Sequence, residues 1–123
     1  MINKFVRNLL FLAAASVILV GCGPEQEKPD SAALVARAQA LVPTDAVLAE
    51  IYSRSCVSCH AIPASTAPLT GDHASWEPRM AKGMDTLLDN VINGVGGMPP
   101  LGLCMDCDMQ QFEDLIQFMG KAH

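Results

Sequence analysis

The sequence predicts an all-α protein built from four to five short helices. Apolar residues recur at helical spacing in several short segments, and no segment alternates apolar and polar residues over the length of a strand. Proline and glycine residues lie between these segments and favour loops there. No internal repeat is evident, so one small domain is expected.

The first two expected helices lie in the N-terminal half of the chain. Residues 31–42 are rich in alanine and have one apolar face, and Pro43 ends this helix. Thr44 or Asp45 can then cap a second helix through a side-chain oxygen. The apolar face of this second helix consists of Val47, Leu48, Ile51 and Tyr52.

The next segments are an irregular loop and a short helix. Residues 61–72 are rich in proline, threonine and glycine, which favours a loop. We expect a helix over residues 75–82, capped by Ser75, with Pro78 in its first turn and Gly83 as its stop.

Two further helices complete the expected fold. Residues 85–93 have one apolar face and end at Gly94. Asp108 can cap the last helix, with Gln111 at the position of a capping-box partner and Gly120 at the end. The apolar face of the last helix consists of Phe112, Leu115, Ile116 and Met119.

The segment Cys56-Val57-Ser58-Cys59-His60 holds two thiols three positions apart, with a histidine directly after the second. This is the attachment signature of a c-type haem. On one helical turn the two sulfurs can each form a thioether bond with a vinyl group of the same porphyrin, and the histidine can bind the iron. The motif therefore predicts one covalent haem c, bound by Cys56 and Cys59, with His60 as an iron ligand.

Two other interpretations of the cysteine pair are possible. It could be half of a zinc site together with Cys104 and Cys107, but 45 positions separate Cys59 from Cys104, against the 15–20 residues usual in four-cysteine zinc folds. It could also be a thioredoxin-like redox pair, which needs a βαβ context that the sequence does not show.

Met98 is the residue we expect as the second axial iron ligand. It follows three glycines and precedes Pro99 and Pro100, on a loop where the backbone can approach the ring closely and is then stiffened. It lies 38 residues beyond His60, which is far enough to reach the opposite face of the haem. The rivals are the other methionines after position 22 and two histidines: Met80, Met84, Met105, Met109, Met119, His73 and His123.

The N-terminus predicts export and lipidation. Lys4 and Arg7 precede an apolar run of 12 residues over positions 9–20, which is short for a membrane span of about 20 residues and typical of a signal peptide. The sequence LVGC, which ends at Cys22, resembles a bacterial lipobox. We therefore expect residues 1–21 to be removed and Cys22 to carry lipid, the alternative being an ordinary secretory signal with an incidental cysteine.

The mature chain is expected to have two parts. Residues 22–43 comprise the lipidated cysteine, a charged, proline-bearing tether and the first helix, and residues 44–123 form the domain. The signal carries two of the 8 basic residues and none of the 13 acidic ones, so the mature chain has a net charge of −7. This charge argues against nucleic acid and favours a partner with a basic docking patch.

Several of these motifs together resemble the class I cytochromes c, specifically the bacterial cytochrome c-five subfamily. The resemblance rests on CVSCH, the spacing of Trp76, Arg79 and Gly83, the segment INGVGGMPPLGLCMDC and the last apolar helix, and it extends over roughly residues 46–119. It implies a helical fold around one haem, with axial His60 and Met98.

The resemblance also implies roles around the haem. The carbonyl of a proline, best matched by Pro68, would accept a hydrogen bond from the His60 ring. Trp76 and Arg79 would lie near a haem propionate, the alternative being a packed indole and a solvated arginine. Subfamily members also have a cysteine pair after the methionine, which here is Cys104 and Cys107.

The cysteine count also favours a structural disulfide between Cys104 and Cys107. Lipid and haem account for the other three cysteines, and an oxidising compartment favours pairing of the last two. Asp106 and Asp108 flank Cys107 with negative charge, which opposes the thiolate that a redox-active pair would need.

A haem with both axial positions filled has no open site for a substrate, which predicts an electron carrier and not an enzyme. Its partners would be redox proteins, such as a terminal oxidase or reductase. We expect a lipid anchor on the periplasmic side of a bacterial membrane, and Gly23 favours the outer membrane because an aspartate there would favour the inner one. The alternatives are a peroxidase-like enzyme or gas sensor in which Met98 dissociates, and a structural lipoprotein with a fortuitous motif.

Overall fold

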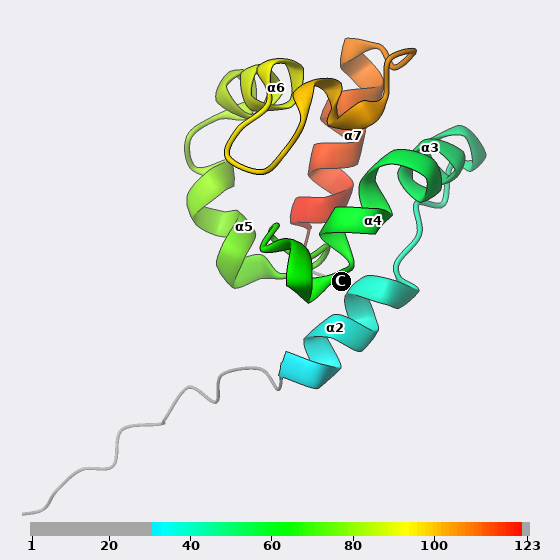
Figure 1. The fold of residues 1–123 in the computed structure, drawn as a ribbon, viewed down its shortest axis with the longest axis vertical. Coiled ribbons are helices and arrows are strands. Elements are labelled where there is room, and N and C mark those ends of the chain that lie inside the picture. Colours follow the sequence, from blue (N-terminus) through cyan, green and yellow to red (C-terminus); the bar gives the residue numbers. More distant parts are fainter. Residues whose placement is uncertain (1–30, 122–123) are drawn as a thin grey trace, which may run out of the picture.

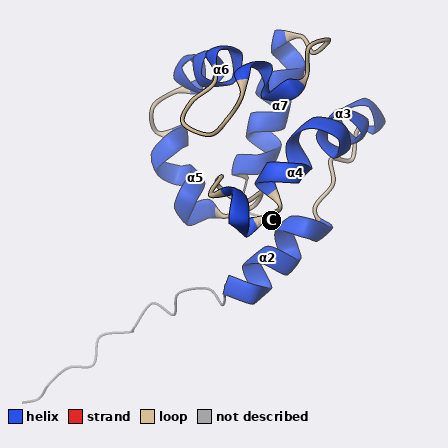
Figure 2. Ribbon diagram, in the orientation of Figure 1, coloured by secondary structure: helices blue, strands red, loops and turns tan. Residues whose placement is uncertain are grey.

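A computed structural model describes residues 31–121, and within them the all-α prediction is confirmed. Figure 2 shows helices joined by loops, and the only β-type pairing in the described part is an isolated bridge between Val95 and Met98. None of the described helices has both the length and the apolar character that crossing a membrane requires. The signal peptide, Cys22, the tether and His123 lie outside the described residues.

The helices are short and follow one another closely. In chain order the elements are α2 (Ser31–Ala40), α3 (Ala46–Ile51), the π-helical turn η1 (Tyr52–Cys56), α4 (Val57–His60), the 3₁₀ turn η2 (Pro63–Ser65), α5 (His73–Met80), α6 (Met84–Asn93), the 3₁₀ turn η3 (Pro100–Leu103) and α7 (Met109–Gly120).

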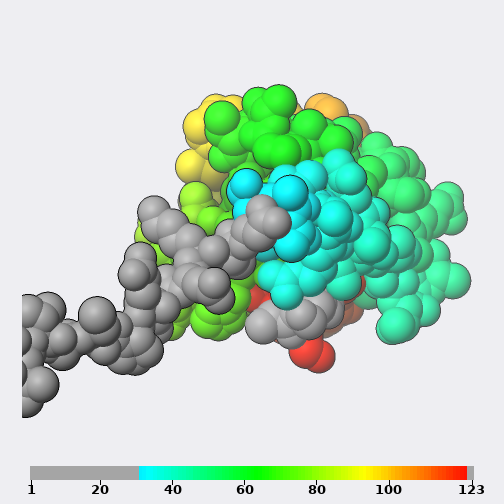
Figure 3. All heavy atoms as spheres, turned by 90° about the horizontal axis from the view of Figure 1, so that it is seen from below, coloured from blue at the N-terminus to red at the C-terminus, as the bar shows by residue number. Residues whose placement is uncertain are grey.

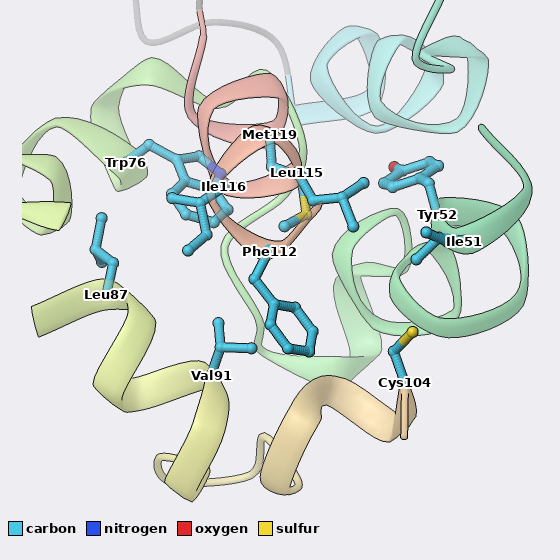
Figure 4. Packing of buried hydrophobic residues seen from close by; sticks show 10 residues of the cluster. All are labelled: Ile51, Tyr52, Trp76, Leu87, Val91, Cys104, Phe112, Leu115, Ile116 and Met119. Carbon is cyan, nitrogen blue, oxygen red and sulfur yellow. The ribbon is translucent and has the colours of Figure 1, made fainter. Parts of the chain in front are cut away.

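Helix α7 is the centre of the arrangement. In Figure 1 it runs between α5 and α6 on one side and α3 and α4 on the other, and it contacts α3, α5 and α6. Figure 4 shows its apolar face, including Phe112 and Leu115, packed against side chains from these elements. Burial of this face follows from the i, i+3, i+4, i+7 spacing of the sequence. Within the described residues, the main cluster of buried side chains consists of Ile51, Tyr52, Trp76, Leu87, Val91, Cys104, Phe112, Leu115, Ile116 and Met119.

Helix α2 lies against the domain. Figure 3 shows its atoms spread over one face of the molecule. Ala38 is fully buried, and the Arg37 guanidinium lies 3.4 Å from the carbonyl oxygen of Gly71. The amide of Gly71 donates in turn to the carbonyl of Met119 at 2.8 Å, so α2 is connected through one turn to the end of α7.

The capping predictions for α3 and α7 are confirmed. The Asp45 carboxylate accepts from the first turn of α3 at 2.9 Å, and Asp108 and Gln111 form the complete capping box of α7. Helix α6 begins one residue earlier than predicted, at Met84, and ends at Asn93 as expected. Helix α2 was predicted to reach residue 42 but ends at Ala40, and Val42 beyond it is exposed. The assignment of Val47 was also wrong, because it is 57% exposed and does not join the buried face of α3.

The start of α5 differs from the prediction. The helix begins at His73, and Asp72 is its cap, because the Asp72 carboxylate accepts from the Ser75 amide and also from the Ser75 hydroxyl. Ser75 is therefore the third helical residue. Pro78 lies in the second turn instead of the first, on an exposed face.

Candidate haem site

The attachment motif lies at the end of one continuous helical run. Residues 46–60 pass from α3 through η1 to α4 without a break. In η1 the backbone widens to a π turn, since the amide of Val57 donates to the carbonyl of Tyr52 five residues earlier. Such turns recur at functional sites because they shift the register of the side chains that follow. Here Cys56 is the last residue of the turn, and Cys59 and His60 follow it.

The His60 ring is buried and held by a backbone carbonyl. The ring atom Nδ1 lies 2.8 Å from the carbonyl oxygen of Pro68. The backbone carbonyl of His60 accepts a hydrogen bond from the Thr70 amide at 2.7 Å. Because a carbonyl only accepts, Nδ1 carries the proton, and Nε2 keeps a free lone pair. Burial and then the charge of Arg79 lower the pKa of His60, while the bond to Pro68 raises it. The ring is therefore a neutral imidazole with one nitrogen ready to bind a metal.

Neither alternative for the cysteine pair fits the geometry. Burial raises the pKa of the Cys56 thiol to about 11, opposite to what a thioredoxin-like nucleophile needs. Within residues 31–121, the one cluster of three metal-binding side chains consists of Cys104, Asp106 and Cys107, and neither cysteine of the motif joins it. A four-cysteine zinc site is thus absent from the described residues.

Trp76 is a packed indole. Its ring centroid lies 5.8 Å from that of His60, and its N–H donates to the carbonyl of Leu69 at 2.8 Å. The indole therefore fixes both the histidine and the loop that holds it. Arg79 is exposed and donates to the Ser75 carbonyl. Contact of either residue with a haem propionate stays a prediction.

Met98 lies at the base of a tight turn. Its amide and carbonyl both bond to Val95, at 2.9 and 3.1 Å, with two glycines between them. Gly94 has a φ of +79°, and a Cβ there would lie 2.7 Å from the Met98 carbonyl oxygen, so only glycine fits. Met98 itself is half-buried and packs against the core.

The segment after Met98 is strained and compact. Leu101, Gly102 and Leu103 all have φ between +53° and +66°, a conformation that is costly for residues with a Cβ. A Cβ on Gly102 would lie 3.3 Å from the Met98 methyl carbon, so this segment directly supports the Met98 side chain. The segment ends at Cys104, whose amide donates to the Leu101 carbonyl at 2.8 Å.

A cysteine pair and an ion pair lie next to this segment. Cys104 and Cys107 have Cα atoms 5.4 Å apart with their sulfurs facing each other, as a disulfide requires. Arg54 in η1 reaches across to Asp106 and forms 2.9 Å hydrogen bonds to both carboxylate oxygens. Sequence reasoning missed Arg54, because nothing local connects residues 52 positions apart.

The donor set of the site fits haem. Two thiols on one turn, neither of them in a disulfide, precede a buried neutral imidazole whose free nitrogen can ligate iron. A methionine on a rigid turn supplies a thioether sulfur from another segment, which suits iron in a c-type centre. These residues would hold the group by Cys56 and Cys59 and ligate it through His60 and Met98.

Comparison with known proteins agrees with this assignment. The family described as cytochrome C oxidase, cbb3-type, subunit III matches residues 43–119. The cytochromes c5 of Ectopseudomonas mendocina and Azotobacter vinelandii are each 36% identical over 73 residues, which is 58% of this chain and 84% and 88% of theirs. The structure of a mono-heme ferrocytochrome c from Shewanella putrefaciens is 41% identical, with a TM-score of 0.55, covering 62% of this chain and 94% of that one.

Fold, site and relatives together define a small protein with one covalently bound haem c that carries electrons and is not an enzyme. The chain belongs to the class I c-type cytochromes and is similar to the cytochromes c5. The resemblance inferred from its motifs is thereby confirmed.

Proposed function

We propose that His60 and Met98 are the two axial ligands of the haem iron and that the protein passes single electrons between redox proteins of a bacterial envelope. The observation that carries the proposal is the Pro68 carbonyl 2.8 Å from His60 Nδ1, which leaves Nε2 as the donor atom for iron. The turn that holds Met98 supports the second ligand.

The chain's own residues would keep the iron closed to outside ligands. The haem supplies the change between ferric and ferrous iron. Pro68 and Trp76 fix the His60 ring, and the Val95–Met98 turn presents the thioether, which as a neutral soft donor favours the ferrous state. With both axial positions taken, small molecules have no place to bind, which suits a carrier.

The N-terminal sequence supports a membrane anchor and favours one of the two bacterial membranes. Cleavage after residue 21 and lipid on Cys22 would anchor the protein on the periplasmic side, and Gly23 favours the outer membrane. Triacyl modification would bury several dozen CH₂ groups at about 0.8 kcal/mol each, so the anchor would be stable. The net charge of −7 in the mature chain favours partners with a basic docking patch, such as a terminal oxidase or reductase.

Carbon monoxide distinguishes the carrier from a sensor or peroxidase-like enzyme. It binds ferrous haem only where an axial position is open or its ligand dissociates readily. We expect the visible spectrum of the reduced protein to stay unchanged when carbon monoxide is added. A shifted Soret band at neutral pH would mean that Met98 dissociates or is not a ligand, and would favour the gas-binding alternative.

The anchor is tested by cell fractionation and mass spectrometry. The parent protein should be found in the membrane fraction with lipid on Cys22, and Cys22→Ala should block both lipidation and processing of the precursor. A parent protein in the soluble periplasmic fraction, without lipid, would overturn the anchor and leave the carrier function standing. Separation of inner and outer membranes then tests the location that Gly23 favours.

A further inference from the structure

Arg54 connects the two segments that carry the proposed iron ligands. It lies in η1, two residues before Cys56, on the helical run that ends at His60. Its Nη2 atom lies 2.9 Å from both carboxylate oxygens of Asp106 and 3.4 Å from the sulfur of Cys104. The contact thus joins the helix of the attachment motif to the loop that follows the Met98 segment.

The residues that Arg54 contacts directly follow η3, the segment that packs against the Met98 side chain. Cys104 is 2% exposed and closes η3, and within η3 Gly102 lies against the Met98 methyl group. Leu101 and Leu103 hold positive φ angles, so the segment does not keep this shape through its own backbone preference. Contacts from outside must hold it. Among the described residues, Arg54 provides a charged contact of this kind from the haem-binding helix.

An exposed ion pair by itself contributes little to stability. The Arg54 side chain is 39% exposed and that of Asp106 is 73% exposed, so the charge attraction is screened by water. The contact differs from a simple ion pair in its geometry, because one guanidinium nitrogen lies near three acceptor atoms on the loop that directly follows the strained segment. A planar guanidinium holds such an arrangement, whereas a lysine ammonium is a single point charge on a flexible stem.

We infer that Arg54 is a positioning residue that keeps the Met98 sulfur on the iron by clamping the Cys104–Asp106 loop to the helix of the attachment motif. This inference rests on the proposed function, in which Met98 is an axial ligand. Loss of the clamp lets η3 relax and the Met98 segment move away from the iron more often. The second axial position is then more accessible to an external ligand.

Imidazole binding to the ferric protein measures this accessibility. Imidazole is neutral above its pKa, so at pH 8 its affinity reports Met98 displacement and is insensitive to the lost arginine charge itself. Arg54→Gln should bind imidazole about three- to tenfold more tightly than the parent. Asp106→Asn, which keeps the arginine and removes its charged acceptor, should shift the affinity in the same direction. The matched control is Arg37→Gln, which removes an arginine contact to the Gly71 carbonyl, far from Met98 in the chain, and should leave the affinity unchanged.

The result that would overturn the inference is an unchanged imidazole affinity in both Arg54→Gln and Asp106→Asn, even if their melting temperatures fall. A fall in melting temperature alone would assign Arg54 a purely structural role. Met98→Ala separates this failure from failure of the proposed function. If Met98 is a ligand, that variant binds imidazole far more tightly than the parent; if it binds with parental affinity, the axial assignment itself is wrong.

Discussion

The hydroxyl oxygen of Tyr52 lies 2.9 Å from the hydroxyl oxygen of Thr70, and both side chains are buried. Tyr52 begins the π turn that leads to the attachment motif, and Thr70 follows the loop that holds His60, with its amide bonded to the His60 carbonyl. The Tyr52 ring also packs edge-on against Phe118 of α7 at 5.3 Å. One buried pair therefore fastens the haem-binding helix to the loop behind its histidine.

Tyr52→Phe should destabilise the protein by about 1–3 kcal/mol, because it leaves the buried Thr70 hydroxyl without its partner while keeping the ring. Chemical denaturation of the haem-loaded protein measures the change. Ser53→Ala is the matched control, since Ser53 donates an exposed bond to the Glu50 carbonyl, and its removal should cost little. Equal stabilities for the two variants would show that the buried pair contributes nothing of its own.

Gly94→Ala should destabilise the Met98 turn by at least about 2 kcal/mol. The backbone at Gly94 has φ +79° and ψ 157°, which is open essentially only to glycine, and the added methyl would lie 2.7 Å from the Met98 carbonyl oxygen. Gly97→Ala is the control on the same turn, because a Cβ there meets nothing within 4 Å. Denaturation curves of the two variants give the comparison, and a tolerated Gly94→Ala would contradict the close approach seen here.

Replacing Cys104 and Cys107 together by Ser should lower the melting temperature and leave the haem spectrum intact. The chain-entropy model gives roughly 2 kcal/mol for a loop this short. Unchanged stability of the double variant, or two titratable thiols in the oxidised native protein, would rule out the proposed disulfide.

The Arg54–Asp106 pair should make stability depend on acid pH. Hydrogen bonds from Arg54 hold the pKa of Asp106 below its usual value, so the pair stabilises the fold above the unfolded pKa of about 4 and is lost as pH falls through the folded one. The melting temperature of the parent should exceed that of Asp106→Asn at pH 6, and the two should converge at lower pH. A gap that stays constant down to about pH 2 would exclude this cause.

The sequence was informative wherever a local signal decided the structure. The capping box of Asp108 and Gln111 and the apolar spacing of α7 are properties of neighbouring residues, and both were predicted correctly. The start of α5 was missed because Asp72 and Ser75 are both good caps and lie three residues apart, so the local signal fits either one.

Other features depend on distant residues and could not be predicted. The π turn over Tyr52–Cys56 contains no residue type that is typical of such turns. Leu101 and Leu103 have positive φ angles, which leucine normally avoids, so their sequence does not predict this conformation. Arg54 and Asp106 meet only through the fold. For the site, the motif predicted the haem-binding side chains and the resemblance predicted the Pro68 carbonyl beside His60, whereas the Arg54 contact was seen only in the structure.

The most direct test of the account is the reduction potential and visible spectrum of Met98→Ala. Loss of the thioether should lower the potential, because a neutral soft donor no longer favours ferrous iron, and should let carbon monoxide bind the reduced protein. Met105→Ala is the control, since Met105 is 77% exposed and belongs to the same stretch of chain. A Met98→Ala protein with the parent's potential and spectrum would contradict the central claim, because another residue would then be the second iron ligand.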